Sequence, residues 1–177
     1  MKKLVSLALV LMLSLCLIAQ GEIVGNTYIN TGIGFTVTAP EGWSFVDGDA
    51  DMPGDEEGAS CTLVTLQDAD EINNMLVMCT NMGSLSPYIS EQMLLDATEE
   101  QVNTQYAEYG FNITAAHEDI VVMGGEHGSV VLTMSLFGIE MVQRYVIVKV
   151  DSIMVEIVAT GSSVEEVDYM ISCVTKL

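Results

Sequence analysis

The sequence predicts an α+β fold in which an antiparallel β-sheet of about six to seven strands packs against two amphipathic helices. Strand-like segments joined by two-residue turns dominate the second half of the chain, which is typical of an antiparallel meander. Two further segments, residues 90–109 and 163–174, carry apolar side chains at helical spacing. The chain has 177 residues, half of them hydrophobic, which suits one domain with a substantial core.

The first twenty-one residues have the three parts of a secretory signal peptide. Two lysines precede an apolar run over residues 4–18, and Ala19 and Gly21 supply the small residues that a signal peptidase requires. The apolar run is shorter than the ~20 residues that span a bilayer. We therefore expect cleavage near Gly21, a secreted or cell-surface protein, and no membrane span in the mature chain. Cys16 offers a lipoprotein alternative, which is disfavoured because Leu15 precedes it where a lipobox has a small residue.

The charge balance excludes several classes of partner. The chain carries 25 acidic and 5 basic residues, a formal net charge of −20. A protein with so few basic residues lacks the positive surface that nucleic acids and anionic membranes require. Its hydrophobic content excludes a disordered acidic tail. We expect an unknown protein or small-molecule ligand outside the cytoplasm as the partner.

The first half of the mature chain predicts one strand and one hairpin. Residues 35–39 alternate apolar and polar side chains, and Pro40 ends them in a turn. Residues 60–67 and 73–80 are strand-like, so residues 68–72 form the loop between them.

A helix over residues 90–109 follows, ending at Gly110. Acidic and polar side chains occupy its outer face, while an apolar stripe recurs at helical spacing on the other. The stripe consists of Leu94, Thr98, Val102, Tyr106 and Tyr109.

Two hairpins and a closing helix make up the rest. The expected strands are 112–123 and 126–136 around Gly124-Gly125, then 140–150 and 153–160 around Asp151-Ser152. The second turn sets Val150 opposite Ile153, which gathers β-branched residues on one face and leaves Glu156 on the other. A one-residue slip would scramble this separation. Ser163 opens a capping box for the closing helix, whose apolar face runs from Val164 to Val174.

Residues 34–43, GFTVTAPEGW, resemble the opening of PsbP/Mog1-like domains, which often begin with a Gly-Phe strand followed by Pro-x-Gly-Trp. The central helix, the meander and the closing helix are also similar, so the resemblance covers most of residues 27–177. It implies an antiparallel sheet with flanking helices. With the signal-peptide pattern, the expected organisation is a signal peptide (1–21), a lead-in (22–33) and a single α+β domain (34–177). The resemblance implies no single function, because members of the family serve as photosystem accessories, transport cofactors and exported proteins of unknown role.

An acidic loop at residues 47–57 is the candidate metal site. Alternating aspartates open a calcium loop, because alternate side chains turn toward one cation. Met52 and Gly58 stand where that loop has a glycine and a bidentate glutamate. We interpret the segment as a solvated acidic loop, with a weak calcium site as the alternative and no other cofactor. The candidate ligands are Asp47, Asp49, Asp51 and Asp55.

Cys61 and Cys79 are the disulfide candidate. They face each other in the predicted hairpin, and an exported protein meets an oxidising compartment. Two buried thiols are the alternative. Cys173 is expected to be a packed thiol, because no activating base accompanies it.

The sequence contains none of the G-x-S-x-G, S-x-x-K and P-loop motifs. His117 and His127 are expected to be surface residues beside the Gly124-Gly125 turn rather than metal ligands. We therefore expect an exported, non-enzymatic binding or accessory domain that binds through the open face of its sheet and the loops near its helices. Two alternatives are a calcium-dependent extracellular module built on the acidic loop and a hydrolase built on paired carboxylates.

Overall fold

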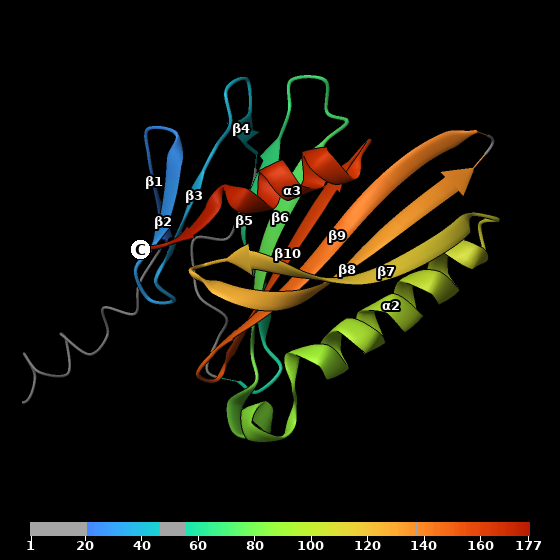
Figure 1. The fold of residues 1–177 in the computed structure, drawn as a ribbon. Coiled ribbons are helices and arrows are strands. Elements are labelled where there is room, and N and C mark those ends of the chain that lie inside the picture. The colour runs from blue at the N-terminus through green and yellow to red at the C-terminus, as the bar shows by residue number, and fades with distance from the viewer. Residues whose placement is uncertain (1–20, 47–55, 137) are drawn as a thin grey trace, which may run out of the picture.

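The protein is described by a computed structural model over residues 21–46, 56–136 and 138–177. Two antiparallel sheets and two α-helices make up this part of the chain, which confirms the α+β class (Figure 1). The larger sheet has seven strands in the order β4-β5-β6-β10-β9-β8-β7, and the smaller has four in the order β1-β2-β3-β11. None of the helices in these residues has the length and hydrophobicity needed to cross a membrane.

The elements have the following bounds, labelled as in Figure 1. The larger sheet contains β4 (Ser44–Phe45), β5 (Ser60–Gln67), β6 (Asn74–Asn81), β7 (Asn112–Val122), β8 (Gly125–Leu136), β9 (Ile139–Val150) and β10 (Ile153–Gly161). The smaller sheet contains β1 (Gly21–Val24), β2 (Thr27–Asn30), β3 (Phe35–Thr38) and β11 (Val174–Lys176). The helices are the 3₁₀-helix η1 (Gly83–Tyr88) and the α-helices α2 (Glu91–Ala107) and α3 (Val164–Ser172).

The smaller sheet differs from the sequence prediction at both of its edges. The expected lead-in forms a hairpin of two strands, β1 and β2, and β2 pairs with β3. The closing helix ends at Ser172 rather than continuing to Val174, and β11 pairs antiparallel with β3. Val174 continues the apolar spacing of the helix, but it is buried opposite Val37 as part of a strand. The sequence alone does not distinguish the two cases, because a single buried valine fits the apolar spacing of a helix and the inner face of a short strand equally well.

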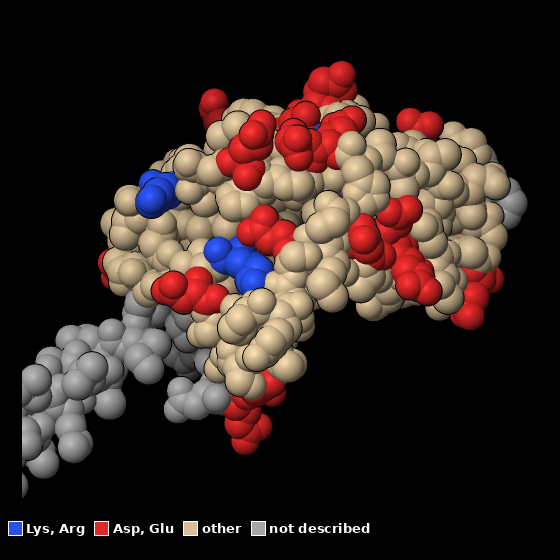
Figure 2. All heavy atoms as spheres, turned by 60° about the horizontal axis from the view of Figure 1, so that its bottom comes forward, with Lys and Arg blue, Asp and Glu red and all other residues tan. Residues whose placement is uncertain are grey.

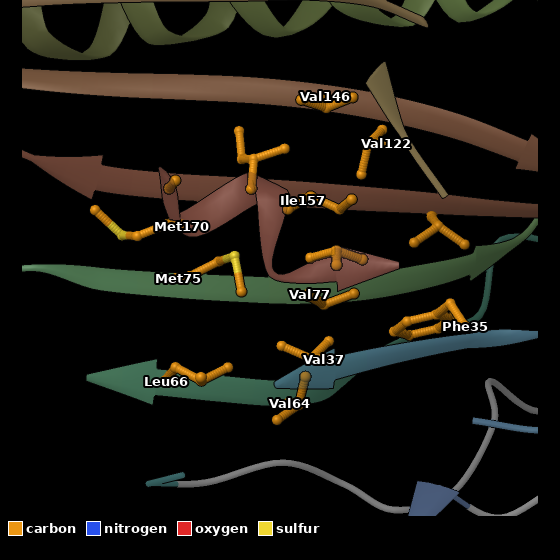
Figure 3. Close-up of a cluster of buried hydrophobic side chains, with 14 of the residues drawn as sticks. Phe35, Val37, Val64, Leu66, Met75, Val77, Val122, Val146, Ile157 and Met170 are labelled. Carbon is orange, nitrogen blue, oxygen red and sulfur yellow. The ribbon is translucent and has the colours of Figure 1, made fainter. Parts of the chain in front are cut away.

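The two faces of the larger sheet bury different clusters. On one face, side chains of β6, β9 and β10 form a core with α3 and the smaller sheet, including Val77, Val146 and Ile157 (Figure 3). On the other face, α2 buries Leu95 and Val102 against β8 and β9. The register around Asp151-Ser152 is confirmed, because Val150 pairs with Ile153 and the β-branched residues line the first face. We call the face that carries α2 the α2 face.

Helix α2 begins after Ser90, whose side chain accepts a hydrogen bond from Met93 N. Glu91 then fixes this end to the sheet, because its Oε1 accepts from Lys149 N at 2.9 Å. Lys149 Nζ donates to the carbonyl of Ser86 and to that of Ile89, and thereby holds the chain that leads into the helix. The predicted stripe extends too far, since Tyr109 follows the end of the helix and is 69% exposed.

The turn between β7 and β8 lies at Met123-Gly124, one residue before the predicted Gly124-Gly125. Val122 pairs with Gly125, and both turn residues have positive φ, 50° and 76°. A two-residue turn of this kind requires positive φ at both positions. Gly125 begins β8, and a Cβ there would lie 2.7 Å from Nε2 of His127, whose side chain would have to shift.

The hairpin of β5 and β6 places Cys61 opposite Cys79, as predicted. Gln67 pairs with Asn74, so the loop is one residue longer than expected, and an irregularity between Thr62 and Val64 shifts the register back. The two Sγ atoms lie 3.3 Å apart, a non-bonded distance, with Cys79 buried and Cys61 half-buried. The disulfide stays a prediction.

Arg144 makes the most buried ionic contact of the described residues, with only 2% of its surface exposed. It extends from β9, and its guanidinium pairs with Glu118 of β7. Its Nε lies 3.1 Å from Asp168 Oδ1 of α3, without the alignment of a hydrogen bond. The guanidinium thus joins α3 to two strands of the sheet.

Replacing Arg144 by alanine removes this contact and leaves a cavity under α3. We expect Arg144→Ala to lower the free energy of unfolding by about 3 kcal/mol, measured by urea denaturation. The exposed Lys176→Ala variant is the control, with a change within about 0.5 kcal/mol. Equal losses in the two variants would show that the buried position of Arg144 is unimportant.

Oxidation is expected to join Cys61 and Cys79. Each thiol loses one electron and one proton to a disulfide oxidant such as oxidised glutathione, which is reduced to two thiols. Alkylation of the oxidised, denatured protein and mass spectrometry should then modify Cys173 but neither strand cysteine. The bond should raise the free energy of unfolding by about 3 kcal/mol, because it closes a loop of roughly 20 residues. Alkylation of Cys61 and Cys79 together with Cys173 after oxidation would contradict this prediction.

Candidate functional site

The candidate calcium ligands Asp47, Asp49, Asp51 and Asp55 lie outside the residues that the structure describes. The calcium alternative therefore stays a prediction. Within residues 21–46, 56–136 and 138–177, no three histidine, cysteine or acidic side chains lie close enough together to hold a metal ion. Cys61 and Cys79 lie in the core beside Tyr28, and the burial of Cys79 raises its pKa well above the usual range of a thiol.

Both histidines contact carboxylates that belong to α2. His117 Nε2 lies 2.7 Å from Glu99 Oε2, and His127 Nδ1 lies 3.2 Å from Glu91 Oε2. His117 is largely exposed as expected, whereas His127 is mostly buried beneath the start of α2. A cavity of about 120 Å³ adjoins His117, with polar lining that includes Glu118 and Asp119. These contacts hold the helix against β7 and β8.

Helix α2 lies toward one side of the α2 face. Helix α2 packs across β7, β8 and β9, on the β7 side of the sheet (Figure 1). The half-buried side chains of β5, β6 and β10 continue this face beyond the helix. We call six of them the open strip: Thr62, Thr65, Leu76, Met78, Met154 and Glu156.

Glu156 is the charged member of the open strip. It pairs with Met78 on β6 and Ile147 on β9, so apolar side chains lie on both sides of it. Burial raises the pKa of the Glu156 carboxyl. It has no hydrogen-bond or ion-pair partner among the described residues.

Tyr145 borders the open strip from β9, and its hydroxyl is already engaged. It donates to Gln143 Oε1 at 2.9 Å, and Gln143 Nε2 in turn donates to Thr160 Oγ1 at 3.2 Å. Burial, together with nearby Tyr106 and Glu156, raises the pKa of Tyr145 far above its usual range. The hydroxyl therefore stays neutral and is directed along this chain rather than toward Glu156.

This arrangement favours a positively charged or N–H-bearing ligand. A desolvated carboxylate without a partner is stabilised by a cation or a strong hydrogen-bond donor. Leu76, Met78 and Met154 would contact the apolar part of the same ligand, and methionine side chains adapt to varied shapes. An anion would be repelled both locally and by the acidic side chains spread over the surface (Figure 2).

The sequence placed Glu156 on the correct face but did not identify it as a site residue. Alternation along a strand is typical of one buried and one solvated face, and a glutamate on the second face attracts no notice. The available signal was its surroundings, since Met154 and Val158 are its neighbours on the same face of β10. Both are apolar, which is unusual for a fully solvated face.

Comparison with solved structures supports the fold. Cyanobacterial PsbP (CyanoP) from Synechocystis sp. PCC 6803 aligns with a TM-score of 0.52 at 15% identity, over 90% of this chain and 94% of that chain. A crystal structure from Bacteroides thetaiotaomicron VPI-5482 aligns with a TM-score of 0.50 at 14% identity, over 88% of this chain and 49% of that chain.

LpqN of Mycobacterium tuberculosis, a protein involved in cell envelope biogenesis, aligns at a TM-score of 0.41 and 11% identity, over 80% of this chain and 82% of that chain. No protein-family model and no curated protein matches the sequence. The alignments with TM-scores of 0.52 and 0.50 show a shared fold, and at their low identities they show nothing of function. The fold-level resemblance expected from residues 34–43 is therefore confirmed, and the chain has the fold of cyanobacterial PsbP.

Proposed function

We propose that this protein is an exported accessory domain that binds a partner through the open strip. The partner would present an ammonium or guanidinium group flanked by apolar groups. The observation that carries this proposal is Glu156, a half-buried carboxylate with raised pKa that lies between apolar neighbours on the α2 face, beyond the strands that α2 mainly contacts. Placing a carboxylate there is unfavourable for folding, and such unfavourable positions are frequent at functional sites.

Export is supported by the signal-peptide pattern of the first twenty-one residues. Binding rather than catalysis is supported by the surroundings of Glu156. Its described neighbours in the strip are threonines, methionines and a leucine, none of which is a general base or an activated nucleophile.

The overall charge supports a basic partner. A net charge of −20 attracts cations at long range and accelerates their association at low salt. Arg144 is matched by the carboxylates of Glu118 and Asp168, whereas Lys149, whose ammonium donates to the carbonyls of Ser86 and Ile89, keeps its positive charge opposite Met154. Long-range attraction alone is not specific, so the test must separate it from recognition by Glu156.

A fluorescent peptide provides that test. One face of the extended peptide presents Leu, Lys and Leu at alternate positions, and binding is followed by anisotropy at moderate salt. We expect Glu156→Gln to weaken binding about tenfold, because the lysine loses its partner. Replacing the peptide's lysine by norleucine should have a similar effect.

The matched control is Glu100→Gln, which removes an equal charge from the exposed face of α2. It should change the affinity less than twofold. Equal weakening by both variants would reduce the interaction to general charge attraction and overturn the proposal, as would an absence of saturable binding.

Glu156 is also expected to lower stability at neutral pH. Because its pKa is raised by burial, the folded state holds the proton more tightly than the unfolded state does. Stability should therefore fall as the pH rises from about 4.3, the usual glutamate value, through the raised folded pKa. Glu156→Gln removes this dependence.

We expect Glu156→Gln to be more stable than the wild type by about 1 kcal/mol at pH 7 and equal to it near pH 4, measured by urea denaturation. Glu100→Gln should show no such pH-dependent difference. A Glu156→Gln variant that is less stable at pH 7 would mean that the carboxylate has a stabilising partner in solution.

A further inference from the structure

We propose a second binding site, for a methylated ammonium group, in a cavity beside α3, the helix that packs on the sheet face opposite α2. The cavity measures about 150 Å³ and lies among the start of β4, the β5–β6 loop and α3. We call it the Trp43 cavity. Its lining residues are Trp43, Asn73, Glu166, Tyr169 and Met170.

Two aromatic rings from separate elements form its walls. Trp43 follows a turn in which its N–H donates to Pro40 O at 3.1 Å, and Gly42 adopts the positive φ of 83° that this turn requires. Trp43 is half-buried against the main core. Tyr169 projects from α3 and is largely exposed, so its ring is available to an incoming group.

The polar lining is negative. Glu166 Oε2 accepts hydrogen bonds from Ser162 N at 2.9 Å and Ser162 Oγ at 2.7 Å, and these bonds lower its pKa. The carboxylate is therefore ionised at neutral pH. Asp68 lies near enough to act electrostatically on Glu166, which adds a second acidic side chain.

Asn73 adds an oriented carbonyl oxygen. Its Nδ2 donates to Asp68 Oδ2 at 2.8 Å, which fixes the orientation of the amide. Its Oδ1 is buried and has no hydrogen-bond partner in the described residues. The negative end of this amide dipole therefore has no compensating donor.

These features select a compact cation that needs no directional hydrogen bond. The carboxylate of Glu166 is already hydrogen-bonded and acts mainly through its charge, while the enclosed Asn73 Oδ1 contributes only the partial charge of its amide dipole. The rings of Trp43 and Tyr169 attract cations through their faces and provide apolar contact. A volume of about 150 Å³ admits a group about the size of benzene, which includes trimethylammonium. Anions are repelled by the same lining.

Trp43 is the one tryptophan of the chain, so its fluorescence reports on this cavity. We expect choline to change the emission saturably. The neutral isostere 3,3-dimethylbutan-1-ol should bind about tenfold more weakly, because it lacks the charge. Equal affinity for the two compounds, or no saturable change with choline, would overturn the proposal.

Variants of the lining residues test whether choline binds in the Trp43 cavity. Glu166→Gln should weaken choline binding several-fold, while Glu165→Gln, an exposed neighbour in the same turn, should leave it unchanged. Tyr169→Phe should retain binding and Tyr169→Leu should lose about tenfold, with circular dichroism confirming that both fold. Equal effects of the two glutamate variants, or of the two tyrosine variants, would contradict the site. Glu156→Gln should leave choline binding intact, so this site and the open strip can fail separately.

Discussion

A seven-stranded sheet with apolar side chains on both faces needs cover on both, and the rest of this structure depends on how that cover is supplied. One face packs against α3 and the smaller sheet. The other packs against a single 17-residue helix, α2, which lies mainly over β7, β8 and β9. The open strip lies at the margin of this helix, where Leu76, Met78 and Met154 pack against its cluster and stay half-buried. A binding surface thus follows from the mismatch between one helix and a wide sheet.

Few positive charges hold the two helices in place. Lys149 and Glu91 fix the start of α2, and Arg144 connects α3 to β7 and β9. Because 5 basic residues face 25 acidic ones, most of the acidic side chains on the surface have no basic neighbour (Figure 2). The composition and the architecture are therefore linked: positive charge secures the helices, and negative charge faces solvent. Both proposed sites combine negative charge with apolar or aromatic surface. In the open strip, Glu156 lies among the side chains of a sheet, and in the Trp43 cavity, Glu166 lines the same cavity as Trp43 and Tyr169.

Local patterns predicted the pairings between neighbouring strands. The register around Asp151-Ser152 followed from the separation of side chains on its two faces, and the opposition of Cys61 and Cys79 followed from the hairpin. The opposition of the two cysteines was predicted with a loop that is one residue too short. The irregularity beside Leu63 shifts the register by one residue and compensates for the longer loop. At Gly124-Gly125 the two glycines left the turn ambiguous by one residue. The pairing of Val122 with Gly125 assigned Gly125 to the strand.

The sequence by itself determined the α+β class, the helix over most of residues 90–109, the meander and the acidity, because each depends on neighbours in the chain or on composition. The tertiary structure decided what depends on distant segments. It made Val174 part of β11, because β3 lies beside it, and it set Glu156 between Met78 and Ile147, because β6 and β9 pair with β10 on either side. It also brought Trp43 to Glu166 and Tyr169, which are more than a hundred positions later. The hydrophobic periodicity of the sequence cannot predict such contacts, since they form only when elements far apart in the chain pack together.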